Sequence, residues 1–167
     1  MAYRNKTYVA FDGDRDINYY YLMKAWKAND SIEFDFHDAH DLNYARDSSE
    51  EESIKRQLRE RMQNSKIFLL LVGTNTKYLT KFVKWEIESA IRRDLPIIVV
   101  NLNDKRSIDN SLCPSSLDGI LSIHIPFKKE IIQYAIDNWP SSHQLHNSKG
   151  DSGAYHYLDS VYKSLGL

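Results

Sequence analysis

The chain alternates short apolar runs with segments in which apolar residues recur at helical spacing. Five runs are rich enough in β-branched, aromatic and aliphatic residues to form strands, at 7–11, 32–36, 66–73, 97–100 and 120–125. The runs at 66–73 and 97–100 are apolar on both faces, which is typical of central strands in a parallel sheet. Residues 32–36 alternate apolar and acidic side chains, so we expect an edge strand with one face in solvent.

Helical periodicity fills most intervals between these runs. The apolar stripes that predict helices are Tyr19, Leu22, Met23 and Trp26; Ile54, Leu58 and Met62; Val83, Ile87, Ala90 and Ile91; Ile132, Ala135, Ile136 and Trp139; and Leu158, Val161, Tyr162 and Leu165. Ser48 and Ser49 each precede a glutamate by three residues, a capping-box pattern that marks the start of the second helix. The polar segments at 37–47 and 140–153 lack apolar periodicity, and we expect both to be surface loops.

The repeated order of strand and helix predicts an α/β fold. We expect a flavodoxin-like, doubly wound parallel five-stranded sheet with helices on both faces. Residues 1–140 are expected to form this domain, and residues 141–167 to add a loop and a short helix packed on it. Ligands of such folds bind outside the carboxyl ends of the strands, so candidate site residues should follow Phe11, Phe36, Gly73 and Val100.

Composition narrows the class of protein. Among 167 residues, 22 Lys and Arg balance 23 Asp and Glu, for a net charge of −1, which disfavours nucleic acid as a partner. The single cysteine, Cys113, excludes an internal disulfide framework and a thiolate-rich metal site. The apolar run at 67–72 is too short to cross a bilayer, and the polar N-terminus does not resemble a signal peptide. We therefore expect a cytoplasmic protein with no membrane partner.

Several familiar sites are missing from the sequence. It has no glycine-rich dinucleotide fingerprint, no P-loop and no nucleophile elbow, which argues against a Rossmann dehydrogenase, an NTPase and an α/β-hydrolase. The histidines and aspartates at 37–41 could share a metal ion, but a polar loop explains them more simply, and we expect no metal. Cys113 lies beside Pro114 in a loop and is interpreted as an ordinary loop residue.

The segment 81–88 is the most informative part of the chain. On a helix, Phe82, Glu86 and Ser89 share a side next to the apolar stripe, so Glu86 is expected at the edge of the buried face. A half-buried carboxylate beside Phe82 and Trp85, at the rim of the crevice, is a candidate catalytic group. A purely structural role as a solvated or paired residue at the edge of a helix is the alternative.

The sequence resembles a TIR-like domain, and more closely the TIR-like proteins of bacterial Thoeris anti-phage systems. The stretches 8–12 and 66–76 resemble the first and third TIR strands with their exits, and 82–90 with 95–100 resembles the aromatic-x-x-x-Glu helix and the fourth strand. The likeness covers about residues 6–137. The sequence departs from the usual pattern at Val83, where a small residue or cysteine is frequent, and at Asp12, where serine is frequent.

The resemblance implies an enzyme that consumes NAD. Its catalytic glutamate, four residues after an aromatic one, corresponds to Glu86, which would support cleavage of the nicotinamide–ribose bond. The ADP-ribose product would be cyclised or conjugated into a signal for a partner effector protein. The expected substrate-binding residues are Phe11, Asp12, Gly13, Asp38, Thr74, Asn75, Phe82 and Trp85. NAD is the substrate and no cofactor is expected; a homo-oligomer and a phage-derived trigger stay open.

Two other function classes compete with this interpretation. A non-catalytic interaction module would use the segment 37–47 and the edge strand before it as its contact surface. A phospho-acceptor receiver domain would use Asp12 and Asp14, but the strand at 66–73 ends in Gly73 and Thr74 without an acceptor aspartate.

Overall fold

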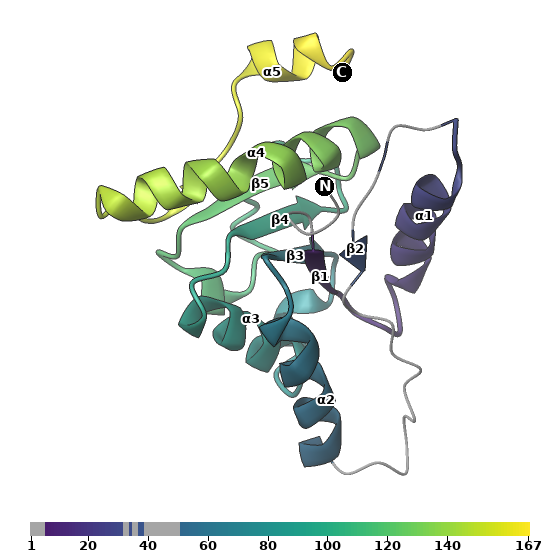
Figure 1. Ribbon diagram of the computed structural model, residues 1–167, viewed down its shortest axis with the longest axis vertical. Helices are drawn as coiled ribbons and strands as arrows, with labels where there is room; N and C mark the ends of the chain where they lie inside the picture. Colours follow the sequence, from purple (N-terminus) through teal and green to yellow (C-terminus); the bar gives the residue numbers. More distant parts are fainter. Residues whose placement is uncertain (1–5, 32–33, 35–36, 39–50) are drawn as a thin grey trace.

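The computed structural model describes residues 6–31, 34, 37–38 and 51–167, and its centre is a parallel sheet (Figure 1). The described strands form one six-stranded sheet in the order β2-β1-β3-β4-β5-β6. The strands are β1 (Lys6–Ala10), β2 (His37–Asp38), β3 (Ile67–Val72), β4 (Ile97–Asn101), β5 (Ser122–Pro126) and β6 (Ala154–Tyr155). The strand order reverses at β1, which confirms the doubly wound, flavodoxin-like α/β fold.

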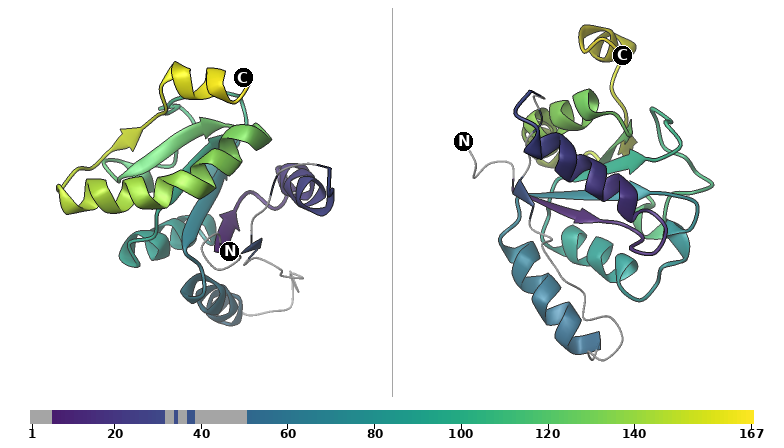
Figure 2. Two further views of the ribbon diagram at one scale, coloured as in Figure 1. Left: turned by 45° about the horizontal axis from the view of Figure 1, so that its top comes forward. Right: turned by 90° about the vertical axis from the view of Figure 1, so that its right-hand side faces the viewer.

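Helices cover both faces of this sheet. On one face lie α1 (Ile17–Ala28) and α4 (Lys129–Ser148), with the short α5 (Asp159–Ser164) beyond α4 (Figures 1 and 2). The other face carries α2 (Glu51–Gln63) and α3 (Val83–Arg92). Two 3-10 helices, η2 (Thr76–Tyr78) and η3 (Ser115–Leu117), follow β3 and β4. The molecule therefore has three layers, with the sheet in the middle.

Strand alternation divides the core between the two faces. On β1 and its exit, Val9 and Phe11 belong to the cluster beneath α1 and α4, whereas Tyr8 and Ala10 belong to the cluster beneath α2 and α3. All residues of β3 and β4 are buried, as their continuous apolar pattern predicts. In the parallel register, Tyr8 of β1 pairs with Phe68 of β3.

The edge of the sheet differs from the prediction at β2. His37 and Asp38, predicted to begin a loop, pair with Lys6 and Thr7 of β1 as a two-residue strand. An edge strand uses its backbone for pairing and needs no continuous apolar pattern, which is why these polar residues can form one. Of the predicted strand at 32–36, the structure describes Phe34 alone; the remainder lies outside the described residues, as do 39–47 and the capping serines.

The predicted loop at 140–153 is wrong for residues 140–148. Helix α4 continues to Ser148, so the proposed boundary between 1–140 and 141–167 falls inside a helix. Trp139 and His143, four residues apart, are both buried and continue the stripe that faces the sheet. This packing outweighs the poor helix propensity of Pro140 and of the polar residues after it. Strand β6 then adds a sixth strand beside β5, beyond the predicted five.

The buried face of α2 is the predicted one, whereas α1 buries a different face from the one predicted. Leu58 and Met62 of α2 are buried, as predicted. On α1 the buried residues are Tyr20 and Met23, whereas Tyr19 and Leu22 of the predicted stripe are exposed. The sequence places three tyrosines in a row at 19–21, and periodicity alone does not reveal which of them faces the sheet.

Candidate active site

Glu86 is buried more deeply than the sequence predicts. It lies in the first turn of α3, where its backbone N–H donates to the carbonyl of Phe82 at 2.8 Å. The expected position was the half-buried edge of the helix, but Glu86 is 4% exposed. Helix α3 packs against the sheet and against α2, and the side chain of Glu86 reaches Tyr8 of β1, so its carboxyl group lies on the sheet side of the helix.

The partner of Glu86 comes from the sheet. The Tyr8 hydroxyl donates a hydrogen bond to Oε2 of Glu86, joining residues 78 positions apart in the sequence. The Tyr8 ring is fully buried and stacks on the ring of Phe68, with 5.8 Å between centroids and 19° between planes. A strand and a stacked neighbour therefore fix the phenol that meets the carboxyl group.

Burial dominates the electrostatics of this pair. Removal from water disfavours the carboxylate and raises the pKa of Glu86 to about 8, while the hydrogen bond from Tyr8 acts in the opposite direction. Glu86 is therefore largely protonated at neutral pH when no ligand is bound. A carboxyl group with such a pKa becomes ionised close to neutrality when a cation approaches it.

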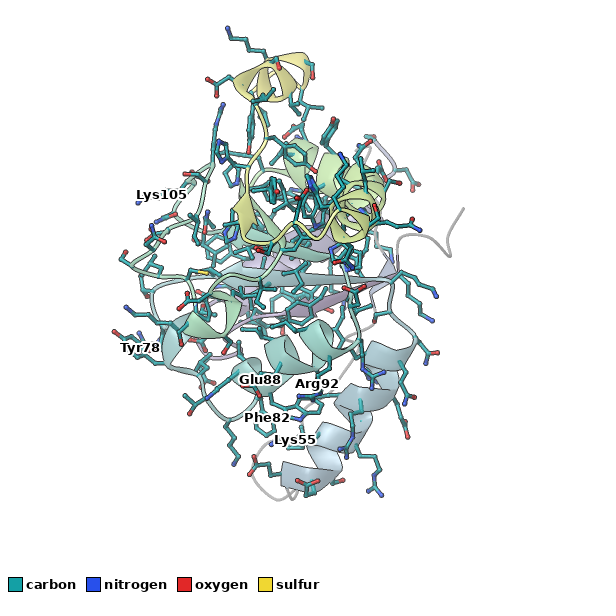
Figure 3. All side chains as sticks on the ribbon, turned by 90° about the vertical axis from the view of Figure 1, so that its left-hand side faces the viewer. Lys55, Tyr78, Phe82, Glu88, Arg92 and Lys105 are labelled. Atoms are coloured by element: carbon teal, nitrogen blue, oxygen red, sulfur yellow. The ribbon has the colours of Figure 1, made fainter. Side chains whose placement is uncertain are left out.

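Two aromatic residues of the same segment lie near the surface. Phe82 and Trp85 are both partly buried. The Lys81 ammonium lies 5.4 Å from the centroid of the Phe82 ring, and the Lys55 ammonium lies 5.8 Å from the centroid of the Trp85 ring. Figure 3 shows Phe82 in the part of the surface where α2 presents Lys55. Each of these rings, on the segment that carries the buried glutamate, thus has an ammonium group near it.

A second group of polar residues gathers at the carboxyl ends of β1 and β3. Oδ1 of Asp12 accepts the backbone N–H groups of Asp14 and Arg15 at 3.0 and 3.3 Å, and Oδ2 accepts the side-chain amide of Asn75 at 3.3 Å. These bonds shape the turn after β1 and attach it to the turn after β3. The predicted pair of Asp12 and Asn75 is therefore brought together.

Asp16 and Gly73 meet beside this turn. Asp16 is buried, and the combination of desolvation and the nearby Asp12 charge raises the pKa of its carboxyl. A Cβ atom on Gly73 would lie 2.5 Å from Oδ2 of Asp16, so the absence of a side chain at Gly73 makes this contact feasible. The backbone N–H of Gly73 donates to Oγ1 of Thr76 at 2.9 Å.

Some of the remaining predicted site residues do not lie near Glu86 or near the Asp12 turn. Phe11 packs on Tyr20, on the face of the sheet opposite Glu86, so it does not form an aromatic wall together with Trp85. The backbone of Asp38 pairs with Thr7, three residues before the end of β1, and this register does not bring it to the Asp12 turn. Gly13 is partly exposed and Thr74 is exposed, both within the turns at the carboxyl edge.

Tyr8, Asp16 and Thr76 were not among the site residues predicted from the sequence. Tyr8 could have been suspected, because a tyrosine inside a buried strand usually finds a partner for its hydroxyl. Which residue would serve as that partner depends on how α3 lies on β1, which periodicity does not reveal. Asp16 and Thr76 read as ordinary turn residues and carried no distinguishing signal.

Two features are absent from the described part of the chain, which omits 1–5, 32–33, 35–36 and 39–50. None of its helices combines the length and the apolar character that a bilayer crossing requires. No cluster of three or more histidine, cysteine, aspartate or glutamate side chains in those ranges has the arrangement of a metal site.

Comparison with known families agrees with the fold. The family model for the TIR-like domain of the Thoeris protein ThsB matches residues 8–107. The matched range begins at Tyr8, contains Glu86 and ends after β4. It thus includes both the buried pair and the turns at the carboxyl edge. The chain belongs to the Thoeris ThsB TIR-like domain family and is a defence-associated TIR-like protein.

Proposed function

We propose that this protein cleaves the nicotinamide–ribose bond of NAD, with Glu86 as its catalytic residue. The observation that carries the proposal is a buried carboxyl group, hydrogen-bonded to Tyr8, in the first turn of α3. Burying an ionisable group is costly, and an apolar residue would fill such a position with less loss of stability. A group retained at that cost, with its pKa moved to about 8, is a candidate for chemistry.

The reaction suits a single carboxylate. As the bond between C1′ of the ribose and N1 of nicotinamide breaks, its electron pair returns to the pyridinium ring, which leaves as neutral nicotinamide. The leaving group needs no general acid, and positive charge develops on the ribose as in glycoside hydrolysis. The carboxylate of Glu86 would stabilise that charge in a site of low dielectric constant. Water then adds to C1′ and releases a proton, or a nucleophilic group of the same molecule attacks and closes a ring.

The cationic substrate matches the protonation behaviour of Glu86. The positively charged nicotinamide riboside would favour the ionised carboxyl and lower its pKa, so that the proton is released to solvent. Phe82 and Trp85 would flank the nicotinamide end, while Asp12, Gly13, Thr74 and Asn75 at the carboxyl edge would receive another part of the dinucleotide. Tyr8 and Asp12 are four residues apart along β1 and its exit, about 13 Å in an extended strand, and NAD is long enough to reach both.

The product is proposed to act as a signal. Membership of the Thoeris family supports a partner effector in defence. We infer that an ADP-ribose derivative, cyclic when water is excluded from the ribose, carries the signal to that effector. Because Glu86 is nearly inaccessible, the substrate must displace part of its cover, and a phage-derived trigger or self-association would supply that change.

The test is nicotinamide release from NAD by the purified chain. It should be measured at high protein concentration and again with lysate from phage-infected cells, because the buried site suggests an enzyme at rest. Glu86→Gln keeps the size of the side chain and removes its charge, and we expect release to fall at least about 100-fold. Glu88→Gln makes the same change two residues away on a partly exposed side chain and should retain activity. Full release by folded Glu86→Gln would contradict the proposal.

A non-catalytic interaction module is the second candidate. The exposed large apolar residues include three on α1, namely Tyr19, Tyr21 and Leu22, which could meet another protein. This function predicts self-association or partner binding that survives Glu86→Gln and is weakened by Tyr21→Ser together with Leu22→Ser. Absence of nicotinamide release under both conditions, combined with such binding, would favour it over the enzyme.

A further inference from the structure

Tyr8 occupies a position from which it could control Glu86, and this inference rests on the proposed function. Its hydroxyl donates to Oε2 of Glu86, and no described residue hydrogen-bonds to Oε1. One carboxyl oxygen is therefore held by the sheet, while the other is left for a ligand.

The Tyr8 side chain is well suited to hold an atom in place. It projects from the middle of β1, whose backbone is paired on both sides, with Phe68 directly across in β3. The stacked ring of Phe68 limits rotation of the phenol, and Tyr8 is 0% exposed. Glu86, by contrast, has a flexible side chain without a ring at the start of a helix, where one backbone hydrogen bond, to Phe82, anchors its N–H. The sheet is thus the rigid partner of the pair.

We propose that Tyr8 is the positioning residue of this site: its hydroxyl fixes Oε2 of Glu86 against the sheet and thereby directs Oε1 toward the ribose. Tyr8 itself touches no reacting atom. Its hydrogen bond also stabilises the ionised form of Glu86, which is the form that balances a positively charged ribose.

Tyr8 is the main polar group that acts on the Glu86 carboxyl. On β1 and β3 the apolar neighbours of Tyr8 that face this side are Ala10, Phe68 and Leu70. The partly buried Lys6, two residues before Tyr8 on the same face of β1, is the charged residue of that strand on this side. From α2, the Lys55 ammonium lies over the Trp85 ring and pairs with Glu51 at 3.0 Å. On α3 itself Lys84 is exposed and Glu88 partly exposed. None of these charges displaces the pKa of Glu86, which responds to burial and to the Tyr8 hydrogen bond.

Tyr8→Phe removes one oxygen atom and keeps the stacked ring. The proposal predicts a fall of at least about tenfold in kcat for nicotinamide release at neutral pH, with a smaller change in KM, because a hydrogen bond to a charged group is lost. It also predicts that the rising limb of kcat/KM against pH moves to higher pH, since the pKa of Glu86 increases. The rate deficit should therefore narrow as the solution becomes more alkaline.

Tyr162→Phe is the matched control. Tyr162 is fully buried on the opposite face, and its hydroxyl has no hydrogen-bond partner among the described residues, so removing this oxygen should leave the rate and pH profile unchanged. If Tyr8→Phe behaves like Tyr162→Phe while wild type is active and depends on Glu86, the positioning role is overturned. Near-ultraviolet circular dichroism would establish that both variants are folded.

A carboxyl titration separates this inference from the proposed function. In protein labelled with ¹³C at glutamate side chains, the Glu86 signal is identified by its loss in Glu86→Gln, and its midpoint is followed by NMR. Tyr8→Phe should move that midpoint upward, and an unchanged midpoint would show that Tyr8 does not hold the carboxyl group. Retained nicotinamide release in Glu86→Gln would refute the proposed catalysis, whereas the titration would still report on the pair.

Discussion

The helices on the two faces of the sheet bury different kinds of side chains. Beneath α1 and α4 the core contains large aromatic and aliphatic side chains, including the fully buried Trp139 and Tyr162, and neither these helices nor α5 contributes a buried carboxyl group. Beneath α2 and α3 the core is equally dense, but α3 places Glu86 inside it. The first face is built to stabilise the fold. The second accepts the desolvation of a carboxyl group, a cost to stability that is consistent with the proposed catalytic role of Glu86.

The largest expected effect lies on the apolar face. Trp139→Ala would remove a 2%-exposed ring from the middle of α4 and leave a cavity. We expect the free energy of unfolding to fall by about 3–5 kcal/mol, measured by denaturant titration. Nicotinamide release per folded molecule should change little. If Trp139→Ala lost nicotinamide release but kept its free energy of unfolding, the two faces would not differ in the way described.

The next largest effect concerns Glu86, where we expect a substitution to raise the free energy of unfolding. Its pKa is raised from 4.5 to about 8 in the folded chain, so the native state holds this proton more tightly than the unfolded state does. The resulting stability is complete at low pH and is lost as the pH rises through about 8. Glu86→Gln does not titrate, and at pH 8 or above it should be more stable than wild type by about 2 kcal/mol or more.

A comparison at lower pH is the control for this stability difference. At about pH 4.5 Glu86 is protonated in the folded state and half protonated in the unfolded state, so the free energies of unfolding of the two proteins should agree to within about 0.5 kcal/mol. Glu88→Gln, on the partly exposed part of the same helix, should show no such gain at any pH. Lower stability of Glu86→Gln at pH 8 would indicate that the ionised carboxyl holds the fold together, contrary to the comparison of the two faces.

The smallest effect lies at the carboxyl edge of the sheet. Gly73→Ala places a Cβ atom against the Asp16 carboxyl, and we expect a loss of about 1 kcal/mol in the free energy of unfolding. Asp16→Ala removes the obstructing atoms, so the double variant should lose less than the sum of the two single variants. Strict additivity would show that the close approach of Asp16 does not determine the residue at position 73.

The sequence predicted the features that depend on one segment at a time. Central strands, the alternation of strand and helix, and the position of Glu86 on the third helix all follow from local patterns. The depth at which Glu86 is buried did not, because it depends on how α3 packs on the sheet. The Tyr8 partner depends on the register between a helix and a strand distant in sequence. Helix α4 is longer than predicted. Local propensity predicts an end at Pro140, but the burial of Trp139 and His143 stabilises the helix beyond that residue.

Nicotinamide release from NAD by Glu86→Gln, measured at pH 8 beside its free energy of unfolding, tests the central claim most directly. The account predicts a variant that is folded, more stable than wild type and deficient in release by at least about 100-fold, because the buried carboxyl is retained for chemistry at the expense of stability. A stabilised variant that releases nicotinamide at the wild-type rate would contradict it.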